Sequence, residues 1–303
     1  MKIILTGGSG FIGSRLVERL ATKGHDVIVL TRDPSSLEIR KYSNVKAKQW
    51  DGKNSGAWSS EVDGADAVMN FAGESIGGKR WTSKQKEKIL NSRIDATRAL
   101  IDAMKQAKKK PGVLINASAV GYYGPVEEGE VMESHQPGND FLAGVCKRWE
   151  QEAQAAEQLG VRVVILRQGV VIDKGGGALE KMSLPYKMFV GGPVGSGRQW
   201  FPWIHRNDAV NIALFAAENI SIAGPVNVVA PEIVRMKEFS KALGRAMHRP
   251  SVLPVPGFVL KVALGEMSEM LLTGQRVVPA RLTVAGYSFL YPQLDRALRA
   301  IFS

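Results

Sequence analysis

Three glycines spaced three residues apart stand near the start of the chain, within the stretch Thr-Gly-Gly-Ser-Gly-Phe-Ile-Gly of residues 6–13. Gly7 allows a tight turn, Gly10 lets a pyrophosphate approach the backbone, and Gly13 lets a helix pack closely on a strand. The N-terminus of that helix offers free N–H groups and a partial positive charge to phosphates. Because an apolar run precedes the loop and an amphipathic segment follows it, we predict a dinucleotide-binding loop rather than a plain glycine-rich turn.

A cation stands where the second strand is expected to end, in the sequence Leu-Thr-Arg-Asp of residues 30–33. Sites selective for NAD place an acid at this strand end to bind the ribose 2′-hydroxyl, whereas a nearby arginine accommodates a 2′-phosphate. Thr31 and Arg32 hold the decisive places, and Asp33 follows one residue late. We therefore predict NADP(H) as the cofactor in preference to NAD(H). The alternative for Arg32 is a solvated loop cation.

The elements that position these residues follow from hydrophobic patterning. Strand candidates alternate with helices near 83–108 and 141–159, and the strands are 3–6, 26–31, 45–49, 67–71, 113–117 and 161–166. Such alternation is typical of an α/β fold, a Rossmann-type doubly wound sheet of mostly parallel strands with helices on both faces. We predict an NADP(H)-binding domain at 1–168, with core strands continuing to about 230, and a smaller substrate or cap region at 169–303 that includes a C-terminal helical segment.

Composition excludes several classes of protein. The chain has 45% hydrophobic and 23% charged residues, which is ordinary for a globular protein. Its net charge of +11 suggests a nucleic-acid partner, but the basic residues are spread among helices and the densest run, 108–110, lies at a helix end. We expect no nucleic-acid or membrane partner. The chain has one cysteine, and its sequence shows no pattern of a signal peptide and no long apolar run. We therefore expect a cytoplasmic location.

Further stretches carry a resemblance to a known family. They are Asn70-Phe71-Ala72-Gly73-Glu74-Ser75-Ile76, Gly78-Lys79-Arg80-Trp81-Thr82, Ser92-Arg93-Ile94, Gly121-Tyr122-Tyr123-Gly124, Asp140-Phe141-Leu142-Ala143, Trp203-Ile204-His205 and Gly274-Gln275-Arg276-Val277-Val278-Pro279. With the glycine loop they resemble the short-chain dehydrogenase/reductase superfamily and, more narrowly, its "epimerase family protein" branch. The resemblance spans essentially the whole chain, including a C-terminal segment that the branch carries as a domain of unknown function.

The resemblance implies a Rossmann fold, an NADP(H) site and an unassigned substrate. The cofactor contacts that it implies are Gly7, Gly10, Phe11, Ile12, Arg32, Ala72 and Gly73. The backbone of Ala72 and Gly73 would face the nicotinamide ribose. Asp51 would sit near the adenine amine, and an ordinary Asp-Gly turn with Gly52 is an equal alternative.

The usual catalytic residues of this superfamily are incomplete. Its chemistry relies on a tyrosine four residues before a lysine on one helix, which lets the ammonium lower the pKa of the phenol. Lys147 is present, but Ala143 stands at the tyrosine position. The usual serine or threonine position holds Ala119, with Ser118 one residue early, and Arg93 replaces a frequent asparagine. The standard mechanism therefore does not transfer to this chain.

Other side chains offer substitutes. Tyr122 or Tyr123 would supply a phenolic proton, with Lys147 holding the ribose, unless these rings pack in the core and in a loop. Glu74 and Glu133 are candidate bases, and each is otherwise a solvated or capping group. We name Lys147, Tyr122, Tyr123 and Ser118 as the candidate catalytic set.

The aromatic stretch 200–205 suggests a substrate contact. Arg198 and His205 would bind an anionic or sugar-like substrate; the alternative is that His205 steadies a helix start near Asp208. We read Cys146 as a buried structural thiol rather than a reactive one. The four histidines are too scattered for a metal site, so we expect no metal.

Two functions of different class remain. The first is an NADP(H)-dependent oxidoreductase or epimerase that transfers a hydride at the nicotinamide with a non-standard acid/base set. Its substrate is unassigned, and a sugar nucleotide rests on fold analogy alone. The second is a dinucleotide-binding regulator or sensor with little or no catalysis, acting through a protein partner. The chain would be a monomer or a homodimer, the latter through the helices near 83–108 and 141–159.

Overall fold

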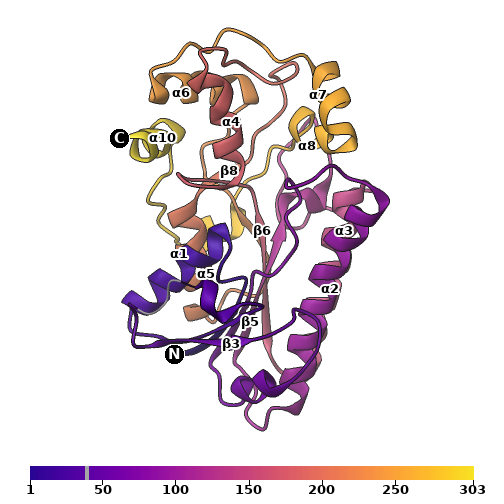
Figure 1. Ribbon diagram of the computed structural model, residues 1–303, viewed down its shortest axis with the longest axis vertical. Coiled ribbons are helices and arrows are strands. Elements are labelled where there is room, and N and C mark those ends of the chain that lie inside the picture. Colours follow the sequence, from indigo (N-terminus) through magenta and orange to yellow (C-terminus); the bar gives the residue numbers. More distant parts are fainter. Residues whose placement is uncertain (38–40) are drawn as a thin grey trace.

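A parallel sheet of seven strands forms the centre of the computed structural model, which describes residues 1–37 and 41–303 (Figure 1). The strand order is β3-β2-β1-β4-β5-β6-β9. Their bounds are β1 Lys2–Thr6, β2 Asp26–Thr31, β3 Val45–Gln49, β4 Ala67–Asn70, β5 Val113–Ala119, β6 Arg162–Gln168 and β9 Gly224–Val228. All neighbouring pairs are parallel, so the predicted α/β fold class is confirmed.

The chain reverses its direction of winding between β1 and β4. Strands β2 and β3 add on one side of β1, whereas β4, β5, β6 and β9 add on the other. In open α/β sheets, ligands bind beyond the carboxyl ends of the strands at such a reversal. The ends of β1 and β4, at Thr6 and Asn70, are paired directly and mark this point.

Helices cover both faces of the sheet because each strand alternates its side chains between them. Ile4 packs with residues of α2 (Ser83–Gln106) and α3 (Phe141–Gln154). Its neighbour Leu5 packs with residues of α1 (Phe11–Thr22) and α5 (Arg206–Glu218). Short 3₁₀ segments complete this part of the fold: η1 Pro34–Ser36, η2 Ala57–Val62, η3 Val120–Tyr123 and η4 Ala155–Leu159.

The second half of the chain builds a smaller region above the carboxyl edge of the sheet (Figure 1). It begins with a two-stranded parallel ladder of β7 (Val170–Ile172) and β8 (Trp203–His205). Its helical elements are α4 Gly177–Lys187, α6 Met236–Met247, α7 Gly257–Leu264, η5 Gly265–Ser268, α8 Glu269–Leu272, α9 Ala280–Val284 and α10 Leu294–Phe302. The chain returns to the large sheet in between, to add β9 beside β6.

A buried carboxylate fastens the C-terminal segment to the large sheet. Asp208 on α5 is fully buried and accepts hydrogen bonds from the backbone N–H groups of Leu290 (2.8 Å) and Tyr291 (2.9 Å). The Tyr287 hydroxyl donates a longer bond to the same carboxylate. Burial raises the pKa of Asp208 above its usual value. The C-terminal segment is therefore held to the Rossmann core by specific polar contacts.

Candidate functional site

The glycine loop is built so that its outer side stays open. Gly7 has a φ of 72°, and a Cβ added there would lie 2.4 Å from the carbonyl oxygen of Phe71. A Cβ on Gly13 would lie 2.0 Å from the carbonyl oxygen of Gly7. These two positions need glycine because strand and helix meet closely. A Cβ on Gly10 would contact only the Gly7 carbonyl oxygen, at 3.2 Å.

The N-terminus of α1 has no side-chain cap. Gly10 is its N-cap residue, and its first turn contains no acidic residue. In contrast, α2, α3 and α5 are capped by the side chains of Thr82, Asp140 and His205. The uncapped N–H groups of α1 and its positive dipole end therefore form an anion site at the reversal point of the sheet. This arrangement fits the pyrophosphate of a dinucleotide.

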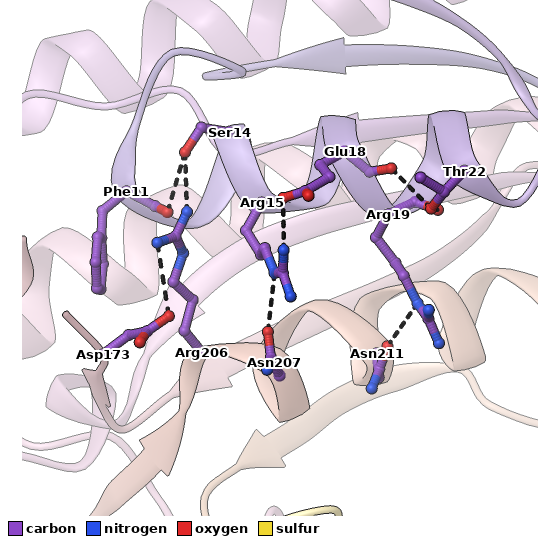
Figure 2. A network of polar contacts seen from close by, with 10 residues as sticks. All are labelled: Phe11, Ser14, Arg15, Glu18, Arg19, Thr22, Asp173, Arg206, Asn207 and Asn211. Atoms are coloured by element: carbon purple, nitrogen blue, oxygen red, sulfur yellow. Dashed lines mark hydrogen bonds and ion pairs between the residues drawn. The ribbon is translucent and has the colours of Figure 1, made fainter. Parts of the chain in front are cut away.

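A cluster of polar contacts braces this first turn against the second half of the chain (Figure 2). The guanidinium of Arg206 donates from Nη2 to Ser14 Oγ at 3.0 Å, and its carbon lies 4.6 Å from the ring centre of Phe11. Asp173 pairs with Arg206 at 3.6 Å. A Cβ on Gly176 would lie 2.7 Å from the Phe11 ring. The Phe11 ring is thus a packing group that holds the loop in place.

The end of β2 presents a cation. Arg32 is exposed directly after the strand. Asp33 turns its carboxylate toward the following turn, where Oδ1 accepts from the backbone N–H of Ser35 at 2.9 Å. The acid that follows Arg32 is therefore engaged in capping a 3₁₀ turn. This geometry favours a phosphate over a hydroxyl as the group bound at the end of β2.

Asp51 forms an Asp-Gly turn with Gly52, which was the alternative to a contact with adenine. Its Oδ1 accepts from the backbone N–H groups of Lys53 (2.8 Å) and Asn54 (2.9 Å). The hydrogen bonds from Asn54 and Lys53 lower the pKa of Asp51. Gly52 supplies the positive φ, 84°, that this turn requires. A contact of Asp51 with adenine stays a prediction.

A buried amide network fixes the end of β4. Asn70 donates from Nδ2 to Asn116 (2.7 Å) and Thr97 (2.9 Å), and accepts from the Thr6 hydroxyl (2.7 Å). The loop that follows, containing the half-buried Ala72 and the exposed Gly73, begins from this anchor. Ala72 also donates its N–H to Thr6 Oγ1 at 3.3 Å. The backbone predicted to face the nicotinamide ribose is thus held beside the glycine loop.

Glu74 closes the same loop against α2. Its backbone N–H donates to Ser92 Oγ at 2.9 Å, and its carboxylate accepts from the Gln85 amide at 3.2 Å. The residue is half-buried. Glu74 thus lies at the predicted nicotinamide end, and its contact with substrate stays a prediction.

Ser118 has a structural role instead of the predicted catalytic one. Its hydroxyl donates to Glu150 Oε1 at 2.6 Å, and both residues are buried. Glu150 also pairs with Arg167, through Nε at 3.0 Å and Nη2 at 2.8 Å. Because neighbouring residues of a strand face opposite sides, Ser118 points into the α3 layer, and Ala119, which could face a substrate, has no hydroxyl.

Tyr123 is also committed to the interior, which corrects its proposed catalytic role. Its hydroxyl donates to Asn227 Oδ1 at 2.6 Å and accepts from Arg167 Nη1 at 3.0 Å. Burial raises the pKa of Tyr123 to about 12. A phenol with both lone pair and proton engaged, and a raised pKa, does not transfer protons near neutral pH. Tyr122 is half-buried, and its hydroxyl has no hydrogen-bond partner among residues 1–37 and 41–303.

Glu133 is buried as well and serves the backbone. Its Oε1 accepts from the N–H groups of Asn227 (3.1 Å) and Arg281 (3.2 Å). These bonds connect β9 to the C-terminal segment. A carboxylate engaged in this way is a capping group, so Glu133 is not the base that we considered.

The predicted lysine of α3 lies at the surface of the protein. Lys147 is exposed and makes no ion pair or hydrogen bond within the described part of the chain. Cys146 takes the inward position instead, against Ser118 and the backbone of Ala119, and burial raises its pKa to about 11. The predicted burial of Cys146 is confirmed, and the role of Lys147 as ribose anchor stays a prediction.

His205 caps the start of α5, and its contact with a substrate stays a prediction. Its Nδ1 accepts from the backbone N–H of Asn207 at 3.1 Å, and its ring stacks on Tyr291 with 3.9 Å between centres. Burial lowers the pKa of His205 to about 4, so the ring is neutral. The helix-start alternative is therefore correct. Arg198 is exposed, and its contact with a substrate stays a prediction.

Sequence reasoning missed Gln168 at the end of β6. The side chain is 8% exposed, and its Oε1 has no hydrogen-bond donor among the described residues. It lies beside Ala119 in the parallel ladder, where a bound nicotinamide is expected. A buried acceptor without a donor is costly, and this oxygen is sealed from solvent, so it marks an unsatisfied group rather than a ligand contact. Its place at the carboxyl end of a central strand was the only signal available.

Two kinds of feature are not found within residues 1–37 and 41–303. None of the helices there has the length and apolar character needed to cross a membrane. No group of histidine, cysteine or acidic side chains in those ranges is arranged to hold a metal ion.

Comparison with known proteins shows the family of this chain. The sequence profile of the NAD dependent epimerase/dehydratase family matches residues 3–229. The chain belongs to that family. Residues 255–301 match a second profile, a domain of unknown function, DUF1731. These two matches confirm the resemblance to the epimerase family branch that we inferred from the sequence.

Two relatives of this chain carry general names. Epimerase family protein YfhF of Bacillus subtilis is 43% identical, over 100% of this chain and 98% of its own length. The chloroplastic SDR39U1 homolog of Arabidopsis thaliana is 44% identical, over 99% of this chain and 86% of its own. These names record the family and no substrate.

Solved structures show the same architecture. The human epimerase family protein SDR39U1 (isoform 2), solved with NADPH, is 33% identical and covers 99% of each chain with a TM-score of 0.89. UDP-glucuronic acid 4-epimerase of Bacillus cereus, solved with UDP-glucuronic acid and NAD, is 20% identical with a TM-score of 0.80, over 100% of this chain and 98% of that one. The second likeness shows the fold alone.

Proposed function

We propose that the chain is an NADP(H)-dependent oxidoreductase or epimerase. The observation that carries this proposal is the exposed Arg32 at the end of β2, with Asp33 turned away into a 3₁₀ cap. The uncapped N-terminus of α1 supplies the adjoining pyrophosphate site. The human relative solved with NADPH supports the same choice of cofactor.

The chain's own residues suggest how the reaction would be arranged. NADP(H), when bound, supplies hydride transfer at the nicotinamide. Tyr122 is the remaining phenol, and the Arg167 guanidinium carbon lies 3.5 Å from its ring centre. Tyr122 would hold and release the proton that accompanies the hydride.

We also propose a substrate class, a domain division, a location and an oligomeric state. A sugar nucleotide as substrate rests on fold analogy, and Arg198 and Glu74 would contact it. We keep a nucleotide-binding domain at 1–168, with core strands continuing to about 230, and a smaller cap region at 169–303; the small ladder that begins at Val170 supports this division. A cytoplasmic location is supported by the single, free thiol of Cys146. We keep a monomer or homodimer without a nucleic-acid partner.

A second candidate is a dinucleotide-dependent regulator. Ser118, Tyr123 and His205 are all engaged in structural hydrogen bonds, which favours it. Consumption of NADPH with a panel of carbonyl and sugar-nucleotide compounds separates the two functions. Turnover that stops in Tyr122→Phe supports the enzyme, whereas tight NADPH binding without turnover of any compound supports the regulator.

Calorimetry with NADPH and NADH tests the cofactor assignment on the wild-type chain, Arg32→Ala and Lys46→Ala. Lys46 is a matched control because it is an exposed cation on the neighbouring strand β3. Loss of a charged hydrogen bond, about 1.5–3 kcal/mol, is expected to weaken NADPH binding roughly tenfold or more in Arg32→Ala alone. Equal loss of NADH affinity would contradict the 2′-phosphate contact, and binding of neither ligand would remove the proposal.

A further inference from the structure

Positive charge gathers at the C-terminal end of α6, in the cap region (Figure 1). Lys241, Arg245 and His248 follow one another at helical spacing and so share one face. Gly244 lets the chain after the helix fold back onto this face, since a Cβ there would lie only 2.8 Å from the carbonyl oxygen of Arg249. The side chains of these four basic residues line an open cavity of about 560 Å³.

Most of this charge has no acidic partner. Arg245 donates from Nη2 to both carboxylate oxygens of Asp295 on α10, at 2.7 and 3.0 Å. Lys241 and Arg249 form no ion pair within residues 1–37 and 41–303. The end of the helix does not need them, because the Gly244 carbonyl oxygen already accepts from the backbone N–H of Arg249 at 2.9 Å. The cavity therefore keeps a net positive charge that is open to an external anion.

Exposed apolar side chains border the same cations. The ring centre of Phe189 lies 4.4 Å from the guanidinium carbon of Arg249, yet Phe189 is 58% exposed. Its φ of 62° is rare for a bulky residue. The chain beside it is held by the backbone N–H groups of Val252 (3.0 Å) and Leu253 (3.1 Å), which donate to the Gly191 carbonyl oxygen. The apolar residues exposed at this border are Met188, Phe189, Val190, Val252 and Leu253. Together with the four basic residues they form the cap patch.

The chemistry of the cap patch fits an anionic membrane surface. Surfaces that bind such membranes combine apolar side chains, which enter the boundary between headgroups and acyl chains, with cations that contact the phosphates. Long basic side chains can reach the headgroups while their stems pack on apolar groups. A second copy of the chain fits less well, because a symmetric contact would bring Lys241 and Arg249 close to the same cations of the other copy.

We propose that the cap patch docks on an anionic phospholipid surface without spanning it. The expectation that the chain has no membrane partner rested on the lack of a long apolar run, which a surface contact does not need. The proposal goes beyond the NADP(H) function and does not depend on it.

Co-sedimentation with lipid vesicles tests the role of the charge. One set of vesicles is phosphatidylcholine alone, and the other is equal parts of phosphatidylcholine and phosphatidylserine. The wild-type chain is expected to bind the second set, less so as salt is added, and to bind the first set only weakly. The double variant Lys241→Gln/Arg249→Gln should bind the anionic vesicles about tenfold more weakly or less still. Its matched control is Lys108→Gln/Lys109→Gln, which removes two exposed cations beyond the end of α2 and should bind as the wild type does.

A second pair of variants tests the apolar side chains. Phe189→Ser should weaken binding to the anionic vesicles severalfold, since the ring no longer enters the headgroup boundary. The control is Ile220→Ser, at an apolar residue that is 85% exposed after α5, and it should leave binding unchanged. Thermal melting checks that each variant is folded. Lys241→Gln alone, at an exposed position, replaces a double variant that is not, and a severalfold loss is expected of it.

Three results would overturn the proposal. The first is a wild-type chain that does not bind the anionic vesicles, or that binds both sets equally. The second is an equal loss of binding in the cap-patch variants and in their controls. The third is a wild-type dimer in gel filtration that Phe189→Ser converts to a monomer, which would assign the cap patch to a second copy of the chain.

Discussion

The guanidinium carbon of Arg167 lies 3.5 Å from the ring centre of Tyr122, while the same guanidinium pairs with Glu150 in the interior. Arg167 also donates from Nη1 to the hydroxyl of Tyr123 at 3.0 Å. Two adjacent tyrosines thus meet one arginine in different ways, the first through its ring face and the second through its hydroxyl. They are expected to respond differently to loss of the hydroxyl.

Tyr123→Phe is expected to lower the free energy of unfolding by about 1–3 kcal/mol, because it leaves buried partners on Asn227 and Arg167 without their hydrogen bonds. Tyr122→Phe keeps its ring over the guanidinium and should change stability by less than about 1 kcal/mol. Urea unfolding of the two variants measures this difference. Equal losses would contradict the separate roles assigned to the two phenols.

Glu150→Gln is expected to cost about 3–5 kcal/mol of stability, because it leaves the buried charge of Arg167 uncompensated. The control is Glu152→Gln on the same helix, where Glu152 pairs with the exposed Arg98 at 3.0 Å. A surface pair contributes about 0–1 kcal/mol, so this variant should be nearly neutral. Denaturant titration at low and high salt checks both values, and a neutral Glu150→Gln would show that the buried pair is not needed.

His205 predicts a pH dependence of stability. Burial lowers its pKa to about 4 in the folded chain, below the ordinary value of 6.5. The unfolded chain therefore binds more protons between these values, and stability must fall as the pH drops from about 6.5 to 4. Protonation of His205 is expected to lower the free energy of unfolding by about 3 kcal/mol at low pH, and this contribution is fully present above pH 6.5.

His205→Asn isolates this contribution, since asparagine retains an acceptor for the helix start. Unfolding free energies measured from pH 4 to pH 7 should fall less steeply in the variant than in the wild-type chain. The carboxylates titrate in both proteins, so their contributions to the pH dependence cancel in the difference between the two curves. Parallel curves would mean that the histidine is accessible to protons in the folded state.

The glycines of the phosphate loop are expected to separate folding from binding. Gly13→Ala should destabilise the fold, because its Cβ would lie 2.0 Å from the Gly7 carbonyl oxygen. Gly10 has an ordinary φ of −78°, and a Cβ added there would contact only the Gly7 carbonyl oxygen, at 3.2 Å. The Gly10→Ala variant should therefore fold. The same methyl group intrudes where the pyrophosphate approaches, and NADPH affinity should fall by about tenfold or more.

Thermal melting and NADPH calorimetry of the two variants check this expectation. A Gly10→Ala chain that folds and binds NADPH as the wild type does would place the pyrophosphate elsewhere. A stable Gly13→Ala chain would show that strand and helix can separate at the loop.

The sequence by itself determined the features that depend on neighbouring residues. The glycine spacing, the apolar strands and the Arg32-Asp33 order are local patterns, and they predicted the parallel sheet and the position of the nucleotide loop. The buried Cys146 also followed from its place on an amphipathic helix. Local geometry is dictated by sterics and hydrogen bonding within a few residues, so it can be inferred without knowing the fold.

Only the tertiary structure decided the roles of the polar side chains. Ser118, Tyr123 and His205 all have residue types that perform catalysis, yet each is engaged in a structural hydrogen bond. Their roles depend on partners such as Asn227, which is distant in sequence. The exposure of Lys147 likewise depends on how α3 is rotated against β5. Burial of a polar group requires a partner, and that partner is set by packing between elements, which no local pattern contains.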